Sequence, residues 1–370
     1  MLCSYLFTFA SLVCTALAQQ HNAEPIVNGT ADDGWQSFPD VIDAKAYPDW
    51  VVDEDAGGYL PVYQTAGLNK TEVTRAIIVL NGKDRTCWSD WTAMNNALYN
   101  ATYDDPTIER DHISIMAPCF FTEADLKAGA ATDDQLIWDN TTWISGHSNV
   151  ADNPSNFSTY DVLDTLVAYY MNTTVYPNLQ VVVIAGHSAG GQMTQRYVAL
   201  RPSNEDDSRL HFWIANPGSL CWLTSDRPFP DDDCDGVDDF KYGLKANFPA
   251  YATADARVLE REGIIERYNG RTISYAWGLV SDVICLRVIF YHSLQEDHGD
   301  GDPRCQAKTQ GNSHLERGQY FVSMLEDMGG VPNCTTVDWV PGISHDAEGM
   351  MASNVGIDKL FRFMGNEGCA

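Results

Sequence analysis

The sequence predicts an α/β protein with a mostly parallel central sheet, crossover helices on both faces of that sheet and a small cap. Two observations predict this class. Short apolar runs alternate along the chain with longer segments of helical periodicity, which is typical of parallel strands joined by crossover helices. The chain has 370 residues, of which 44% are hydrophobic, and this is enough apolar material for one large core or two modest ones. Because no internal repeat or linker interrupts the alternation, we expect a single domain.

The strands are expected at six short apolar runs, each suited to a strand that is covered on both faces. They cover residues 76–80, 113–117, 181–185, 212–215, 273–277 and 337–340. The longer segments between them predict the helices. One begins at Ser158 or Thr159, one covers residues 254–268, one ends at Gly329 and Gly330, and the last ends at Gly365.

The cap is expected from about residue 220 to residue 250, where Pro, Asp and aromatic residues break the alternation. Within it, the run from Asp231 to Gly236 imitates the spacing of a calcium-binding loop. Tyr242, however, stands at the twelfth position, where such a loop has Glu. A solvated acidic loop is therefore the prediction, and neither a metal nor a cofactor is expected.

The segment VVVIAGHSAGGQMTQRYVALRP combines a buried strand, a G-x-S-x-G turn at residues 186–190 and a helix that ends before Pro202. A sharp turn from strand to helix forces its central residue into a strained backbone conformation, and the glycines beside it let the chain pass without clashes. The central hydroxyl is then presented to a pocket. Ser188 is therefore the predicted nucleophile.

With this motif the sequence resembles the α/β-hydrolase superfamily, from about Arg75 to the final helix. The stretches RAIIVLNGKD, VIAGHSAGG, CQAKTQGNSHLERG and VPGISHDAEGM are similar to secreted fungal hydrolases of the esterase or lipase type. The resemblance implies a triad in the chain order Ser, then Asp or Glu, then His. His345 follows the last strand and precedes the last helix, so the resemblance makes it the general base.

The triad acid is expected after the strand at residues 273–277, where its carboxylate can accept the imidazole N–H of the base. Asp282 is the first candidate, and Asp297, Asp300 and Asp302 lie downstream. The run VICLRVIFYHSLQ departs from the family directly after Asp282, because a polar loop is expected there. This run, residues 283–295, is either an extra strand or buried loop, or a segment absent from the mature protein, such as a retained intron.

Acyl transfer also needs hydrogen-bond donors directed at the developing oxyanion. The resemblance implies one donor at the backbone N–H of Ala189, and a second in the loop after the strand at residues 76–80. Gly82 and Lys83 are both candidates for that second backbone donor. Five tryptophans in the predicted connections are either pocket lining or core packing. They are Trp88, Trp91, Trp138, Trp143 and Trp222.

The first eighteen residues, MLCSYLFTFASLVCTALA, form an uncharged apolar run that ends in Ala-Leu-Ala. Residues 1–18 are therefore predicted to be a secretory signal peptide, and residues 19–370 the mature hydrolase domain. No later run is long and apolar enough to predict a membrane span. Seven N-x-S/T sequons predict an extracellular glycoprotein. They lie at Asn28, Asn69, Asn100, Asn140, Asn156, Asn172 and Asn333.

Ten cysteines are present, and removal of Cys3 and Cys14 with the signal leaves an even number. In an oxidising compartment this predicts disulfides, although their connectivity cannot be read from sequence. Cys221 with Cys234, which close a short loop, are the pair expected first. The further candidates are Cys87 with Cys119 and Cys334 with Cys369, which leaves Cys285 and Cys305.

The chain carries 51 Asp+Glu against 23 Lys+Arg, a formal net charge of -28. Such a surface repels phosphate backbones, so nucleic acid is excluded as a partner. The sequence thus predicts a secreted serine hydrolase that cleaves a carboxylic ester of a small molecule, lipid or polymer through an acyl-enzyme. Two alternatives stay open: a serine peptidase or amidase on the same fold, and an inactive secreted binding protein with a hydrolase scaffold. The oligomeric state is not predicted.

Overall fold

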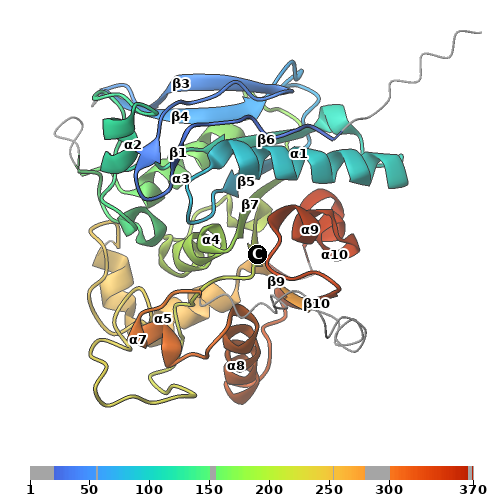
Figure 1. The fold of residues 1–370 in the computed structure, drawn as a ribbon. Helices are drawn as coiled ribbons and strands as arrows, with labels where there is room; N and C mark the ends of the chain where they lie inside the picture. The colour runs from blue at the N-terminus through green and yellow to red at the C-terminus, as the bar shows by residue number, and fades with distance from the viewer. Residues whose placement is uncertain are drawn as a thin grey trace, which may run out of the picture.

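A mixed β-sheet runs through the centre of the protein in this computed structural model, with helices packed against it (Figure 1). The structure describes residues 21–55, 57–150, 156–252, 254–279, 301–365 and 369. Within these residues the large sheet has the strand order β10-β9-β8-β7-β5-β6-β4-β3. A separate two-stranded ribbon pairs β1 (Gly29–Thr30) with β2 (Gly34–Trp35).

All six predicted strands are confirmed, and they form the parallel part of the sheet. They are β5 (Arg75–Leu80), β6 (Ile113–Pro118), β7 (Val181–His187), β8 (Leu210–Ala215), β9 (Thr272–Leu279) and β10 (Thr335–Pro341). The side chains of β5 to β8 are buried without exception, as the apolar runs required. The predicted fold class is therefore confirmed.

The sequence did not predict the other edge of the sheet. There β4 (Gly58–Thr65) pairs antiparallel with β6, and β3 (Ala44–Asp53) pairs antiparallel with β4. Pro48 and Pro61 interrupt the patterns of these two strands, and a proline within a run argues against a strand unless the strand lies at an edge. Of these two strands only β3 lies at the edge, and both prolines fall at the register shift between Tyr47 and Trp50, where a bulge interrupts the pairing of β3 with β4.

The helices cover both faces of the sheet (Figure 1). Their bounds are α1 (Cys87–Asp104), α2 (Glu123–Ala128), α3 (Thr159–Met171), α4 (Ala189–Leu200), α5 (Ala254–Asn269), α7 (Cys305–Lys308), α8 (His314–Asp327), α9 (Ala347–Ala352) and α10 (Asn354–Ile357). The predicted start of α3 is confirmed, because the Ser158 hydroxyl accepts the N–H of Asp161 at 3.0 Å. The last predicted helix is shorter than expected, since α10 passes into the π-helical turn Asp358–Arg362.

Two apolar cores lie on opposite faces of the sheet. Ile78 and Leu80 of β5 belong to the core that includes α3, α4 and α8, whereas Ile77 and Val79 belong to the core that includes α1 and α10. This alternation follows from the two-residue period of a strand. The ends of the parallel strands are thereby held between two packed layers.

Between β8 and α5, residues 216–252 form turns and bends without a helix or strand. This stretch contains the predicted cap at residues 220–250. It is anchored at one end by buried Trp222, whose ring packs edge-on against Phe321 of α8 at 5.5 Å between centroids. The acidic loop extends away from this anchor, and Asp231 and Asp233 in it are exposed.

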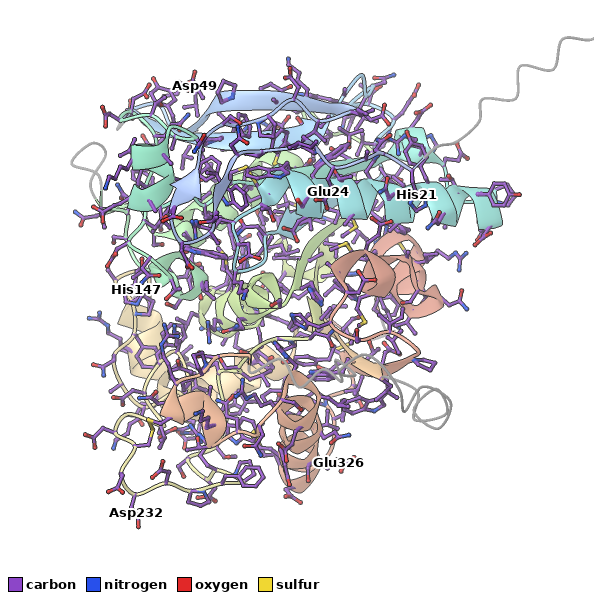
Figure 2. All side chains as sticks on the ribbon, in the orientation of Figure 1. His21, Glu24, Asp49, His147, Asp232 and Glu326 are labelled. Carbon is purple, nitrogen blue, oxygen red and sulfur yellow. A yellow bond between two sulfur atoms is a disulfide. The ribbon has the colours of Figure 1, made fainter. Side chains whose placement is uncertain are left out.

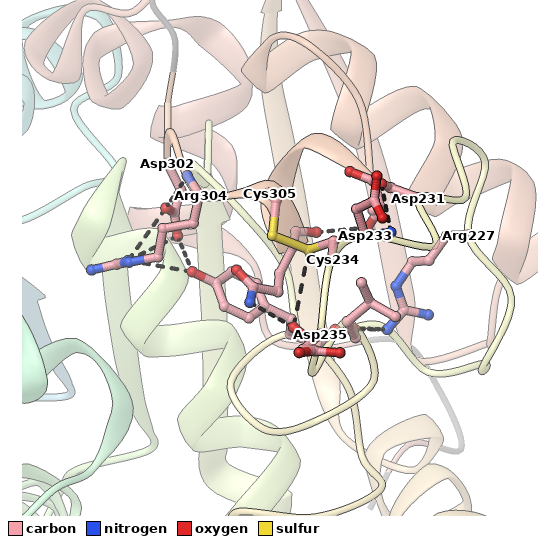
Figure 3. Close-up of a disulfide and its surroundings, with 12 residues drawn as sticks. Arg227, Asp231, Asp233, Cys234, Asp235, Asp302, Arg304 and Cys305 are labelled. Atoms are coloured by element: carbon pink, nitrogen blue, oxygen red, sulfur yellow. Dashed lines mark hydrogen bonds and ion pairs between the residues drawn. A yellow bond between two sulfur atoms is a disulfide. The ribbon is translucent and has the colours of Figure 1, made fainter.

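The predicted disulfide between Cys221 and Cys234 is wrong. Cys234 is bonded to Cys305, 71 positions away in the chain, and this bond joins the acidic loop to the start of α7 (Figure 3). Cys221 lies fully buried beneath that loop as a free thiol among the described residues, with its Sγ 3.5 Å from the carbonyl oxygen of Gly243. Closeness in sequence therefore did not bring these two side chains together.

The other two predicted disulfides are confirmed. Cys87 at the start of α1 is bonded to Cys119 after β6, and Cys334 is bonded to Cys369. Cys285 lies outside the described residues. Within the described ranges, no helix combines the length and the apolar character that a membrane crossing needs. The same ranges hold no cluster of three His, Cys, Asp or Glu side chains arranged to bind a metal ion.

Candidate active site

Ser188 stands at the turn between β7 and α4, with a backbone conformation of φ 57° and ψ -118°. An L-residue adopts such a positive φ only where surrounding structure holds it there. A Cβ at Gly186 would meet the backbone of Gly190 at 2.2 Å, and a Cβ at Gly190 would meet the carbonyl oxygen of Leu80 at 2.3 Å. The glycines on either side of Ser188 thus let β7, α4 and β5 approach closely enough to hold the turn.

His345 lies in the loop between β10 and α9, where the sequence placed it. Ser188 and His345 line the same two cavities. One has a volume of about 400 Å³ and is bordered by the N-terminal part of α1, and we call it the α1-side cavity. The other has a volume of about 500 Å³ and includes Lys241, and we call it the Lys241-side cavity. The predicted nucleophile and base therefore face a common space.

Three histidine rings lie next to one another at this site. The ring of His345 is 4.5 Å from that of His187 and 4.1 Å from that of His314, measured between centroids. Burial, and then the neighbouring His345 and His314, lower the pKa of His187 well below its ordinary range, so His187 is neutral. The sequence analysis assigned no role to His187 or His314, although both stand in stretches that carried the family resemblance.

Asn216, at the end of β8, connects the elements around these rings. Its side-chain amide nitrogen lies 3.2 Å from Nε2 of His187 and donates to the carbonyl oxygen of Ser344 at 3.2 Å. Its amide oxygen accepts the N–H of Gly278 in β9 at 2.9 Å. Asn216 is fully buried, so these bonds fix the loop that carries His345 against the ends of two strands. No sequence pattern singled this residue out.

The candidates for the triad acid divide into two groups. Asp282, Asp297 and Asp300 lie outside the described residues, and so does the run at residues 283–295. Asp302 is described and buried. Its carboxylate accepts hydrogen bonds from Tyr242 at 2.7 Å and from Ser219 at 3.2 Å.

The candidate oxyanion donors lie at the start of α4 and in the loop after β5. Ala189 is the first residue of α4, so its N–H lies among the first amides of that helix, which have no partner within the helix. Gly82 and Lys83 both line the α1-side cavity. The N–H of Gly82 is bonded to the carboxyl group of Asp90 at 3.3 Å. Lys83 is exposed and lines both cavities.

Asp90 brings a buried carboxyl group to this site, and the sequence analysis did not identify it. It belongs to the first turn of α1 and is 7% exposed. Burial raises its pKa from 3.8 to about 7, and the hydrogen bond from Gly82 opposes this rise. With this pKa, the carboxyl group that contacts the predicted oxyanion loop changes its protonation state near neutral pH.

The two cavities differ in charge. Five acidic residues line the α1-side cavity, namely Glu24, Asp84, Asp90, Asp346 and Glu348. Glu24 accepts a hydrogen bond from Ser89 at 3.0 Å and lies against α1 (Figure 2). The Lys241-side cavity is lined instead by two basic residues, Lys241 and Arg304, and by the acidic residue Asp302.

The five tryptophans are packing residues. Each is at most 2% exposed, and Trp88 and Trp91 belong to α1 rather than to a connection. Trp138 and Trp143 pack around Phe120, with ring centroids 5.3 and 6.1 Å away. None of the five lines either cavity that Ser188 and His345 share, so for this site the core-packing interpretation is the correct one.

The chain matches no protein-family model and no curated protein sequence. Solved structures resemble it in fold. A poly(3-hydroxybutyrate) depolymerase from Bordetella parapertussis is 20% identical, with a TM-score of 0.51 over 83% of this chain and 86% of that one. Poly(aspartic acid) hydrolase-1 from Sphingomonas sp. KT-1 is 20% identical, with a TM-score of 0.49 over 83% and 95%. A siderophore hydrolase from Aspergillus nidulans is 10% identical, with a TM-score of 0.43 over 87% and 96%.

Proposed function

We propose that this chain, which has the α/β-hydrolase fold, is a secreted serine hydrolase that cleaves carboxylic esters. One observation carries the proposal. Ser188 occupies a strained turn between a buried strand and a helix, and His345 lines the same two cavities. Strain at a residue that faces a cavity is typical of a functional site. A hydroxyl and an imidazole in that setting are the two groups that nucleophilic acyl transfer requires.

In this mechanism the Ser188 Oγ attacks the ester carbonyl carbon while His345 takes the hydroxyl proton. The tetrahedral intermediate then collapses, the bond to the alcohol breaks, and His345 returns its proton to the departing oxygen. Water attacks the resulting acyl-enzyme with His345 again as base, which releases the acid and restores Ser188. We assign Asp282 as the acid that orients His345, because it follows β9 in the chain order of the family.

The oxyanion is proposed to be held by the backbone N–H groups of Ala189 and of the loop at Gly82 and Lys83. The hydrogen bond between Gly82 and Asp90 favours Lys83 as the second donor. Asp90 would then fix the loop through Gly82 and leave the neighbouring N–H available.

Secretion belongs to the same proposal. The apolar run at residues 1–18 is assigned as a signal peptide, and three disulfides among the described residues suit an oxidising compartment. Six of the seven sequon asparagines are exposed and the seventh, Asn100, is half-buried, so their positions are compatible with glycosylation. The substrate class stays at esters of small molecules, lipids or polymers.

The test is covalent labelling of the purified protein by a fluorophosphonate, read by intact mass, in wild type and in Ser188→Ala. Hydrolysis of 4-nitrophenyl esters with short and long acyl chains is measured in parallel, together with the matching 4-nitroanilides. We expect labelling and ester hydrolysis in the wild type and neither in the variant. Faster cleavage of the anilides would indicate a peptidase or amidase. A folded wild type that takes no label would indicate a binding protein on a hydrolase scaffold.

A further inference from the structure

We propose that Lys241 and Arg304 bind a carboxylate group carried by the ester substrate, so that the enzyme prefers anionic esters. This inference rests on the proposed function, because it concerns the cavity that Ser188 and His345 share with these two side chains. The cavity volume of about 500 Å³ is within the range of small-molecule sites. A substrate whose carbonyl lies at Ser188 would therefore place its remaining atoms beside Lys241 and Arg304.

Lys241 is half-buried, and among the described residues only the carboxylate of Asp302 offsets its positive charge, without a direct ion pair. Among the residues that the structure describes, its ammonium group has neither an ion pair nor a hydrogen bond, and its nearest aromatic neighbour is the Tyr242 ring at 5.7 Å. Burial, and then the positive charges of Arg196 and Arg304, lower the pKa of Lys241 from 10.5 to about 7, and the carboxylate of Asp302 opposes this fall. A partly desolvated ammonium without a partner is costly, and an anionic ligand would remove that cost.

Arg304 comes from a different chain segment than Lys241, and hydrogen bonds hold its guanidinium group in place. Its guanidinium group donates to both carboxylate oxygens of Asp302 at 3.2 Å (Figure 3). It also donates to the Thr141 hydroxyl at 3.1 Å. The Arg304 side chain nevertheless keeps 45% of its surface exposed, so it can accept a further anionic partner from the cavity. Fixing a guanidinium before the ligand arrives lowers the entropic cost of binding.

Behind the cavity wall, Arg196 adds a third positive charge. It is fully buried, and its guanidinium donates to Gln192, to Ser219 and to the carbonyl oxygen of Lys241. Its Nη1 atom has no partner among the described residues. Lys241, Arg304 and Arg196 thus face the single carboxylate of Asp302, which leaves an excess of positive charge in a chain whose formal net charge is -28.

The charge of the neighbouring cavity fixes the direction of binding. Glu24, Asp84, Asp346 and Glu348 on the α1 side would repel a carboxylate. An anionic ester is therefore expected to lie with its charged end toward Lys241 and its uncharged part toward α1. A singly charged carboxylate suits this site better than a phosphate dianion, because Asp302 borders the same cavity.

The test compares two pairs of esters that differ only in charge. 4-Nitrophenyl hydrogen adipate and its methyl ester vary the acyl side, and 4-acetoxybenzoate and its methyl ester vary the alcohol side. We expect kcat/KM to favour the anionic member of at least one pair by about ten- to a hundredfold, the contribution of one or two charge-assisted hydrogen bonds. The pair that shows the preference identifies the side of the substrate that enters the Lys241-side cavity.

Lys241→Met should reduce this preference toward unity, and Lys241→Arg should retain most of it. The matched control is Lys127→Met, which removes one exposed lysine of α2 far from the cavity and should leave the preference unchanged. Fluorophosphonate labelling of Ser188 confirms that each variant is folded. Equal kcat/KM for both members of both pairs in an active wild type would overturn the inference, and so would a preference that survives in Lys241→Met. The absence of any ester hydrolysis would overturn the proposed function instead.

Discussion

Asp90 places an ionisable group where the proposed mechanism needs only backbone N–H groups. Its carboxyl group is buried, accepts the N–H of Gly82, and has a pKa raised from 3.8 to about 7. Between these two values the folded protein holds a proton that the unfolded chain releases. The free energy of unfolding must therefore fall as the pH rises from about 4 to about 7, and Asp90 contributes least to stability above that range.

Asp90→Asn should stabilise the protein at pH 8 and leave its stability unchanged at pH 4. Asparagine can still accept the N–H of Gly82 but cannot ionise, so the expected gain at pH 8 is on the order of 2–4 kcal/mol. Urea unfolding of wild type and variant at both pH values measures the difference. Asp84→Asn, which removes an exposed carboxylate of the same cavity, serves as the control. A gain of equal size at pH 4 and pH 8 would contradict this account of Asp90.

At the scale of elements, the close approach of α4 to β5 holds the nucleophile turn in place. A Cβ on Gly190 would lie 2.3 Å from the carbonyl oxygen of Leu80 and 3.0 Å from that of Asn81, and both atoms belong to the backbone. Backbone atoms cannot rotate away as a flexible side chain can. Any side chain at this position must therefore move α4, Ser188 and the oxyanion loop relative to one another.

Gly190→Ala is expected to lower the free energy of unfolding by about 1–3 kcal/mol or more, the usual range for overpacking, and to reduce esterase activity sharply. Gly82→Ala provides the matched comparison for stability, because a Cβ there meets nothing within 4 Å. Thermal unfolding of both variants separates the steric effect from the general cost of replacing glycine. If the two variants had the same midpoint, the packing argument for Gly190 would be wrong.

The elements that sequence patterns predicted are those whose surroundings are uniform. The parallel strands β5 to β9 are buried along nearly their whole length, so a short apolar run identifies each of them, whereas β10 at the edge is only partly buried. The failures have physical causes too. The antiparallel strands β3 and β4 contain prolines. Helix α1 buries residues around most of its circumference, including Asp90 and Asn95, so it lacks a clear polar face.

The same distinction explains which site residues could be predicted. Ser188 and His345 follow from local motifs and chain order, whereas Asn216, Asp90 and Lys241 act through contacts between distant segments. Asn216 joins β8 to β9 and to the loop at Ser344, a relation that no spacing in the sequence encodes. The division of charge between the two cavities likewise arises only when the loops are assembled.

At the scale of the whole molecule, the disulfide between Cys234 and Cys305 connects the loop-rich segment after β8 to the chain that carries Arg304. Gln306 strengthens this connection by donating to the carbonyl oxygen of Asp235 at 2.8 Å. The two chain segments that contribute Lys241 and Arg304 to the cavity wall are thereby linked to each other. The disulfide between Cys334 and Cys369 fixes the end of the chain instead.

Replacing Cys234 and Cys305 together by alanine should lower the free energy of unfolding by about 2–4 kcal/mol. It should also weaken the preference for anionic esters, because Arg304 loses its covalent anchor. The double alanine variant of Cys334 and Cys369 is the control, and we expect it to lower stability without changing that preference. Thermal unfolding and the kcat/KM ratio of the adipate pair measure the two effects. An unchanged ratio in the first variant would show that the disulfide does not position Arg304.

Thr141 lines the Lys241-side cavity and accepts a hydrogen bond from Arg304, and the residue before it, Asn140, is an exposed sequon asparagine. A glycan on Asn140 would therefore lie next to the cavity and hinder access to it. Small esters would diffuse past such a glycan, while a wide polymer chain would have to displace it. Cells that attach different sugars to this one asparagine would thus make enzymes with the same chemistry and different access for bulky substrates.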